Sequence, residues 1–155
     1  MGEMELGKVA VAEVMNTDPP VVETTAGLCR VARMLRRQSH VWVVKSKQDR
    51  EVVGIVTERD FLDLLSPLPE MMYTTGVLHP KSLYHGEVAT VQDFMTSPVV
   101  SCSPRDTVER ALEELWHKRI RRLAVIESNQ LVGELSMKGI IAAYYITTCS
   151  MSDGA

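Results

Sequence analysis

The sequence has neither the long apolar runs of a membrane protein nor the excess of positive charge that is typical of a nucleic-acid-binding protein. Apolar runs such as "VWVV" and "IIAAYYI" are far shorter than the roughly 20 residues of a transmembrane helix. The formal net charge of −3 gives no global positive field that would attract nucleic acid or anionic lipid. We therefore expect no membrane association, and any anion-binding site must be a local cluster of residues.

The chain is also poor in residues that form disulfide frameworks or metal sites. Its three cysteines, Cys29, Cys102 and Cys149, are scattered and odd in number. No pair of the four histidines has the spacing of metal ligands. The N-terminal stretch "MGEMELGKVAV" is acidic and too mixed for a signal peptide. These features predict a reduced, cytoplasmic protein without a metal.

What the chain does have is an internal repeat. Its 155 residues suit one compact domain or two small repeats packed together. Gly54 pairs with Gly133 and Thr57 with Ser136, and both differences, 133 − 54 and 136 − 57, equal 79. Other stretches match at nearby offsets, which implies small insertions in loops: "EVMNTDPPVVETTAG" (13–27) with "DFMTSPVVSCSPRD" (93–106), and "SHVWVV" (39–44) with "RRLAVI" (121–126).

The second copy predicts the order β-α-β-β-α. Val99–Cys102 is β-branched and bounded by prolines, which is typical of a short strand. A helix then starts at Asp106-Thr107, "RLAVI" and "QLVGELS" form a hairpin around "ESN", and a helix spans Lys138–Ile146. The first helix has four apolar residues at helical spacing, which we expect on its core face: Val108, Ala111, Leu112 and Leu115.

The first copy predicts the same order of elements. They are the strand Val21–Glu23, a helix carrying Leu28, Val31, Ala32 and Leu35, the strands Val41–Val44 and Glu51–Val56, and the helix Asp60–Leu65. We therefore divide the chain into a lead-in (1–12), a first repeat (13–65), a linker (66–89), a second repeat (90–146) and a tail (147–155). The fold class is α/β (α+β), with two repeats related by a pseudo-two-fold axis and ligand clefts between them.

The linker has two interpretations. Its prolines and glycines argue against long regular structure, and it is long for a connection within a compact domain. It is either a surface crossover or a lid that would use Lys81, Tyr84 or His85 to cover a ligand.

Taken together, the repeated motifs resemble a tandem pair of CBS (cystathionine-β-synthase) domains, also called a Bateman module. The resemblance rests on "VMNTDPPVVETT", "SHVWVV" and "GIVTERDFLDLL" in copy one. In copy two it rests on "FMTSPVVSCSPRDTVERAL", "RIRRLAVI" and "LVGELSMKGIIAAY". It implies a stand-alone regulatory module that binds AMP, ADP, ATP or S-adenosylmethionine in clefts between its repeats, and that forms a homodimer.

The Thr57-x-x-Asp60 element supports two roles that can coexist. Thr57 follows a strand and precedes an apolar helix, so it can cap the helix while Asp60 completes a capping box. The same helix start can bind a nucleotide, because its free N–H groups and hydroxyl suit a phosphate. A carboxylate one turn into the helix can accept hydrogen bonds from both ribose hydroxyls.

The resemblance implies two related pockets. In pocket one, backbone groups near Val99 and Val100 would read the adenine edge and Ile120 would pack on its face. Arg121 and Arg122 carry planar charged groups suited to phosphate, although cations at a helix end also stabilise it without a ligand. The full set of residues for pocket one is Thr57, Arg59, Asp60, Ser97, Val99, Val100, Ile120, Arg121 and Arg122.

Pocket two lacks the ribose anchor, because Gly139 stands where copy one has Asp60. We expect it to be empty or altered, with Lys138 or His40 facing phosphate, although for His40 we favour the role of a strand-edge residue over a ligand contact. Its residues are Thr17, Val21, Val22, Ser39, His40, Ser136 and Lys138.

The function predicted from the sequence is a non-catalytic sensor that signals to a protein partner through a ligand-dependent change of conformation or assembly. No grouping of serine, histidine and acid is visible, and nothing marks Cys102 as an activated nucleophile. Two alternatives remain open: a structural dimerisation module with empty clefts, and a regulator that binds nucleic acid through local basic residues.

Overall fold

The computed structural model describes residues 5–65 and 90–150, which divide into two compact units. Unit 1 contains the described residues of Met1–Pro19 and Val100–Ala155, and unit 2 contains those of Pro20–Val99. The linker 66–89, with its two interpretations, lies outside the described residues.

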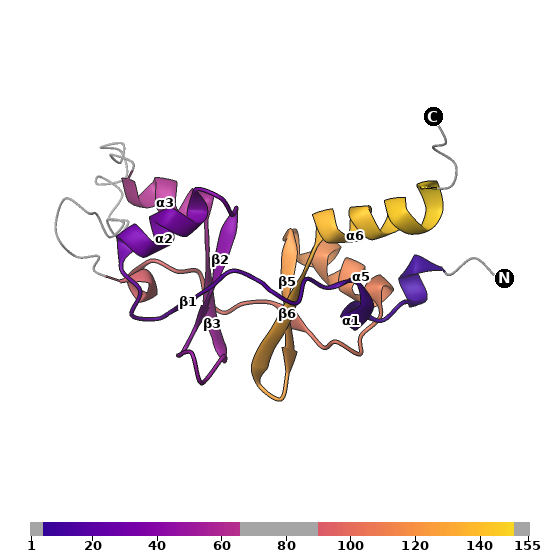
Figure 1. Ribbon diagram of the computed structural model, residues 1–155, viewed down its shortest axis with the longest axis horizontal. Helices are drawn as coiled ribbons and strands as arrows, with labels where there is room; N and C mark the ends of the chain where they lie inside the picture. Colours follow the sequence, from indigo (N-terminus) through magenta and orange to yellow (C-terminus); the bar gives the residue numbers. More distant parts are fainter. Residues whose placement is uncertain (1–4, 66–89, 151–155) are drawn as a thin grey trace. The chain divides into compact units, whose positions relative to one another are not determined.

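Unit 2 is a three-stranded sheet with two helices (Figure 1). The strand order is β1-β2-β3, with β1 parallel to β2 and β2 antiparallel to β3. The elements are β1 (Val21–Glu23), α2 (Leu28–Leu35), β2 (His40–Val44), β3 (Val52–Thr57), α3 (Glu58–Leu65) and the short 3-10 helix η3 (Val91–Asp93).

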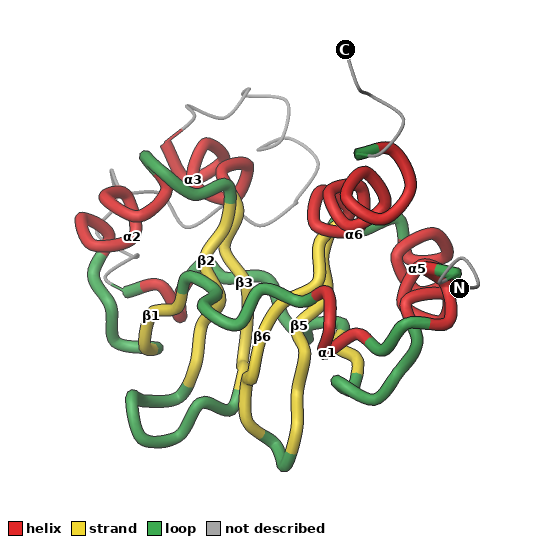
Figure 2. The backbone as a smooth tube through the Cα atoms, turned by 45° about the vertical axis from the view of Figure 1, so that its right-hand side comes forward, coloured by secondary structure: helices red, strands yellow, loops and turns green. Residues whose placement is uncertain are grey.

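Unit 1 repeats this architecture with the sheet order β4-β5-β6 and the same parallel and antiparallel pairings. Figure 2 shows α6 following directly from β6. The elements are η1 (Leu6–Lys8), α1 (Val11–Val14), β4 (Ser101–Cys102), α5 (Val108–Lys118), β5 (Arg122–Glu127), β6 (Gln130–Ser136), α6 (Met137–Tyr144) and a π-helical extension (Tyr145–Cys149).

The predicted fold class and element order are confirmed in both copies. The strand at Val99 starts later than predicted, because only Ser101 and Cys102 pair with β5. The hairpin around "ESN" is also confirmed. Its turn residues Ser128 and Asn129 have φ angles of 50° and 62°, as two-residue hairpin loops with positive φ at both central positions require.

Each sheet is joined by a segment that comes from the other sequence copy. Asn16 forms an antiparallel bridge with Glu134 on β6, and Thr96 forms one with Ile55 on β3. The start of copy one, residues 13–19, therefore belongs to unit 1, and residues 91–96 belong to unit 2. The structural units thus cut across the sequence repeats.

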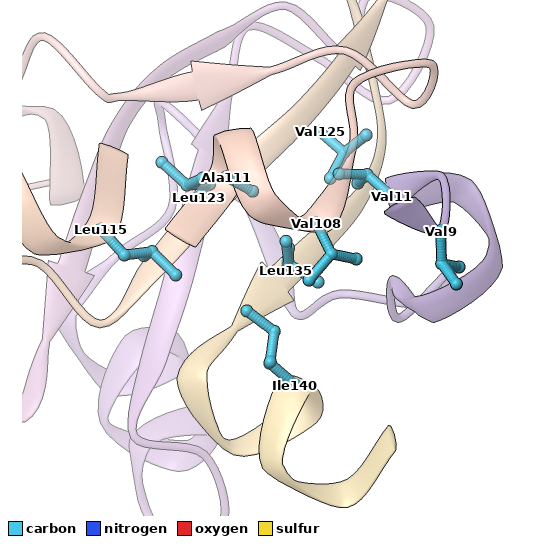
Figure 3. Close-up of a cluster of buried hydrophobic side chains, with 9 residues drawn as sticks. All are labelled: Val9, Val11, Val108, Ala111, Leu115, Leu123, Val125, Leu135 and Ile140. Carbon is cyan, nitrogen blue, oxygen red and sulfur yellow. The ribbon is translucent and has the colours of Figure 1, made fainter. Parts of the chain in front are cut away.

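Each unit has an apolar core between its sheet and its helices. In unit 1 the core side chains come from α5, α6, both strands of the hairpin and the lead-in (Figure 3). In unit 2 the buried cluster consists of valines: Val22, Val31, Val41, Val43, Val56 and Val91. The alternating strand residues Val41 and Val43 belong to this cluster, as expected for a strand with one face on its own core.

One predicted core residue is wrong. Leu112 was expected on the core face of α5, but its side chain is 41% exposed. Val108, Ala111 and Leu115 are buried as predicted. The apolar stripe is wider than the surface that covers it, and the next residue along the stripe, Trp116, is 82% exposed.

The bridging segments require glycine on the strands beneath them. A Cβ at Gly133 would lie 2.8 Å from the backbone oxygen of Asn16, whereas a Cβ at Gly54 would meet only the side chain of Met95. Since a flexible side chain can move and a paired backbone cannot, we expect Gly133→Ala to lower the free energy of unfolding by about 1–3 kcal/mol, and Gly54→Ala by less. Urea unfolding measures both.

Gly27→Ala is the matched control, because a Cβ there would meet nothing within 4 Å. Equal losses for Gly54→Ala and Gly133→Ala would show that the backbone contact at Asn16 does not distinguish the two positions.

Candidate ligand site

The start of α3 forms the capping box that the sequence predicts. The backbone N–H of Thr57 donates to Oδ2 of Asp60 over 2.8 Å, and the backbone N–H of Asp60 donates to Oγ1 of Thr57 over 3.4 Å. The Thr57 hydroxyl also donates to Oδ2 of Asp60, over 3.1 Å. The hydroxyl proton of Thr57 is therefore engaged by the carboxylate, and phosphate binding through it would require this bond to break.

Thr96 is a site residue that the sequence analysis missed. Its hydroxyl donates to Oδ1 of Asp60 over 3.2 Å. Both oxygens of the Asp60 carboxylate are thus oriented by unit 2 itself, while Asp60 remains half-buried. Each carboxylate oxygen has two lone pairs, so Oδ1 retains room for one further donor such as a ribose hydroxyl. A signal was available, because a polar residue follows the paired methionines in both copies.

The equivalent helix start in unit 1 keeps only half of this arrangement. Ser136 caps α6 by accepting a hydrogen bond from the backbone N–H of Gly139 over 2.9 Å. Position 139 has no side chain to return a bond to Ser136 or to face a ligand.

Unit 1 instead has a carboxylate on the strand that leads to this helix. Glu134 on β6 is 7% exposed, and its Oε1 accepts a hydrogen bond from Nδ2 of Asn16 over 3.2 Å. Asn16 and Glu134 bridge each other as Thr96 and Ile55 do, so Asn16 occupies the place of Thr96. In both units a side chain on the bridging segment holds a carboxylate, but the carboxylate comes from a different element.

Within unit 2, residues predicted for both pockets lie together at one end of the sheet. His40 pairs with Thr57 across β2 and β3, and the backbone oxygen of Ser39 accepts from the N–H of Glu58 over 3.2 Å. Oγ of Ser39 also lies 3.1 Å from Nδ1 of His40. His40 is buried and packs edge-on against Trp42, with 6.0 Å between ring centroids. Ser39 and His40 thus lie beside Thr57, although the sequence assigned them to pocket two.

Unit 1 shows the same grouping around Ser136. Arg122 pairs with Ser136 across β5 and β6, and the backbone oxygen of Arg121 accepts from the N–H of Met137 over 2.9 Å. The two arginines therefore lie at the N-terminal end of α6, where Lys138 is also exposed. This places three cationic residues at the end of a helix that attracts anions.

A hollow of about 550 Å³ adjoins this helix start. It lies within unit 1, between the C-terminal half of α5 and the beginning of α6. Two residues predicted for pocket one, Ile120 and Arg121, line it together with Met137. Its walls are mainly apolar, and Arg119 and Arg121 are among the lining residues.

The other predicted residues are divided between the two units. In unit 2, Arg59 lies in the first turn of α3, Ser97 and Val99 follow Thr96, and Val21 and Val22 belong to β1. In unit 1, Thr17 follows Asn16, and Val100 precedes β4 with its oxygen bonded to the N–H of Ala124 over 3.1 Å. The residues predicted for each pocket are thus distributed over the two units.

The Cys102 thiol has the opposite of an activated environment. Burial, and then the carboxylates of Asp106 and Glu114, raise the pKa of Cys102 from 9.0 to about 11. The thiol is therefore neutral over the physiological range, and a neutral thiol is a poor nucleophile.

None of the helices in residues 5–65 and 90–150 has the length and apolar character that a membrane span requires.

A family model, the CBS domain, matches the chain twice, at residues 11–67 and 91–146. Among curated proteins, an uncharacterized 33.4 kDa protein in the ribosomal RNA operon of Thermofilum pendens is 28% identical over 130 residues. The match covers 84% of this chain and 38% of that protein. A homoserine O-acetyltransferase of Methanosphaerula palustris is 26% identical over 87% of this chain, which is 24% of its length. The chain spans less than two thirds of each of these relatives.

Many solved structures share the fold, and two examples contain ligands. CBSX2 in complex with AMP superposes with a TM-score of 0.70 at 20% identity, covering 88% of this chain and 96% of that one. The CBS domain pair of protein MJ0100, in complex with 5′-methylthioadenosine and S-adenosyl-L-methionine, gives a TM-score of 0.64 at 15% identity. That match covers 88% of this chain and 99% of the other.

The raised pKa makes a prediction about cysteine reactivity. A pKa of about 11 instead of 9.0 leaves about 100-fold less thiolate at pH 8, so Cys102 should be alkylated far more slowly than an ordinary thiol. The exposed Cys29 is the internal reference. Iodoacetamide labelling of the folded protein at pH 8, followed by peptide mass spectrometry, measures both rates. Labelling of Cys102 as fast as Cys29 would contradict the assigned environment.

Proposed function

The chain belongs to the CBS domain family, and we propose that it is a regulatory module that binds an adenine nucleotide and has no catalytic activity. Solved CBS domain pairs with the same fold contain AMP or S-adenosyl-L-methionine, so adenosine-containing ligands are the class to test first. We propose AMP, ADP or ATP as the natural ligand and keep S-adenosylmethionine as a second candidate.

The observation that supports this proposal best is the orientation of Asp60. Its carboxylate is fixed by Thr57 and Thr96, so little conformational entropy remains to be lost when a ligand binds. One lone pair of Oδ1 remains for a ribose hydroxyl, and a charged acceptor makes a stronger hydrogen bond than a neutral one. The Asp60 side chain is therefore preorganised to accept a hydrogen bond from a sugar hydroxyl.

Pocket one keeps the full Thr57-x-x-Asp60 element. We propose that Thr57, Arg59 and Asp60 hold the ribose and phosphate, while Val99 and Val100 contact the adenine edge. The remaining residues of this proposed pocket are Ser97, Ile120, Arg121 and Arg122. Ser39 and His40 lie beside Thr57, so we add these two side chains as further candidates for contact with phosphate.

Pocket two would be the weaker of the two. Its helix start offers Ser136 and Lys138 without a carboxylate at position 139. Arg121 and Arg122 lie beside Ser136, so this end of unit 1 suits an anionic group better than a sugar. We propose that pocket two does not bind a nucleoside and that its ligand preference differs from that of pocket one.

The output of the module would be a shift between conformations or assemblies that a protein partner recognises. We also propose that the chain forms a homodimer and acts in the cytoplasm, as the sequence predicts. A ligand can shift such an equilibrium only by its difference in affinity for the two states.

Isothermal titration calorimetry with AMP and 2′,3′-dideoxy-AMP tests the ribose contact directly. We expect one AMP per chain and a loss of about 10- to 100-fold in affinity for the dideoxy ligand, because a hydrogen bond to a carboxylate contributes about 1.5–3 kcal/mol. In Asp60→Ala, which has no side-chain acceptor, the two ligands should bind with equal, reduced affinity. Asp63→Ala, at an exposed neighbour on α3, is the matched control and should bind AMP like the wild type.

The outcomes separate the parts of the proposal. If millimolar AMP, ADP, ATP and S-adenosylmethionine give neither heat nor a thermal shift, the nucleotide-binding function is wrong and the structural dimerisation module is favoured. If AMP binds but Asp60→Ala still distinguishes the dideoxy ligand, the ribose role of Asp60 is wrong. Salt-sensitive gel shifts with DNA or RNA would instead support the nucleic-acid regulator.

A further inference from the structure

Unit 2 contains a run of basic residues without an acid among them. Between Glu23 and Asp49 the sequence has four arginines and two lysines but no aspartate or glutamate. The arginines lie on α2 or in the turn that follows it, and all four are exposed: Arg30, Arg33, Arg36 and Arg37. In a chain of net charge −3, this helix is therefore a local concentration of positive charge.

The four arginines share one side of the helix. At about 100° per residue, Arg30, Arg33 and Arg37 lie within an arc of about 60°, and Arg36 lies about 60° beyond Arg33. From Arg30 to Arg37 they extend over about 10.5 Å, at about 1.5 Å per residue. The opposite side of α2 packs into the core of unit 2 through the fully buried Val31. We call the stripe of four arginines the arginine face.

The charge of the arginine face is not neutralised by its surroundings. Within residues 5–65 and 90–150, none of the four arginines takes part in an ion pair. The corresponding helix of unit 1, α5, mixes both signs of charge. At an offset of 80 residues, its acidic positions correspond to a cysteine, an arginine and a methionine of α2: Glu109, Glu113 and Glu114.

Helix stability does not explain this arrangement. Arg30 lies in the first turn of α2, where the positive end of the helix dipole repels a cation. Arg30 and Arg33 are three residues apart, and Arg33 and Arg37 are four apart. Like charges at these spacings destabilise a helix. Arg30 and Arg33 therefore lower the stability of α2, and an anionic partner would remove this unfavourable repulsion.

We propose that the arginine face binds an acidic segment of a protein partner. The planar guanidinium group of arginine pairs with a carboxylate through two parallel hydrogen bonds. Carboxylates at positions i, i+3 and i+7 of a partner helix repeat over the same length of about 10.5 Å. The inference deepens the proposed function, because that function rests on a protein partner whose chemistry is here named. The docking itself requires no nucleotide.

Other polyanionic surfaces match the arginine face less well. Insertion into a membrane needs exposed apolar side chains beside the cations, and among the described residues the large exposed apolar side chains lie on other elements. Binding of single-stranded nucleic acid relies on aromatic side chains that stack on bases, and α2 has none. The net charge of −3 also opposes a long polyanion.

Fluorescence anisotropy of a fluorescein-labelled octaglutamate peptide with the full chain, in about 50 mM salt to limit screening, tests the docking. We expect the double variant Arg30→Gln/Arg33→Gln to bind the peptide about 10-fold more weakly than the wild type. Arg110→Gln/Lys118→Gln is the matched control, because it removes the same charge from exposed positions of α5. It should bind like the wild type, and octaglutamine should not bind. Circular dichroism checks that both variants fold.

Cys29 reports where the peptide binds. Its thiol is exposed and lies one turn before Arg33, so bound octaglutamate should slow the labelling of Cys29 by iodoacetamide. Cys149, in the π-helical extension of unit 1, is the internal control and should be labelled at an unchanged rate. Equal protection of both cysteines would contradict binding at the arginine face.

Thermal unfolding distinguishes a docking role of Arg30 from a structural one. Because Arg30 is repelled by the helix dipole and by Arg33, Arg30→Gln should raise the midpoint of unfolding. A lower midpoint would show that Arg30 stabilises the fold, which would contradict the reason given for a partner.

The remaining outcomes decide between partners. The proposal is wrong if octaglutamate does not bind, or if it binds the variant of α2 as tightly as the wild type. Tighter binding of an oligothymidylate of equal charge would assign the face to nucleic acid, and binding to phosphatidylserine vesicles alone would assign it to a membrane. Both double variants should bind AMP like the wild type in calorimetry. A wild type that binds octaglutamate but no nucleotide would therefore refute the nucleotide-binding function and leave the docking surface intact.

Discussion

The backbone pairing between Thr96 and Ile55, and its counterpart between Asn16 and Glu134, is the constraint on which the other features depend. Each pairing binds a segment of one sequence copy onto the sheet of the other, so the chain has to exchange its leading segments to complete either core. The close approach of the backbone excludes a side chain at Gly133. The same pairing carries the Thr96 hydroxyl to Asp60, and a candidate ligand group is thereby oriented by an element of the fold.

Local patterns predicted most of the fold because the interactions behind them are local. The β-branched strands, the apolar stripe of α5 and the capping box of Thr57 and Asp60 depend on residues a few positions apart. The hydrogen bond from Thr96 to Asp60 joins positions 36 residues apart, and no local sequence pattern predicts such a contact. The exposure of Leu112 was missed for a related reason. Periodicity shows which side of a helix is apolar, but it does not show how much of that side the rest of the chain covers.

Duplication gave the two units one architecture, and their differences lie at the places where ligands and partners would bind. Unit 2 keeps a carboxylate at the start of its helix, whereas unit 1 has Gly139 there and a carboxylate, Glu134, on the preceding strand. The positions that follow Leu35 in unit 2 and Leu115 in unit 1 differ as sharply, since one is Arg36 and the other Trp116. Both substitutions leave the core unchanged, because the buried positions of α2 and α5 remain apolar. The fold therefore allows the two surfaces to acquire separate roles.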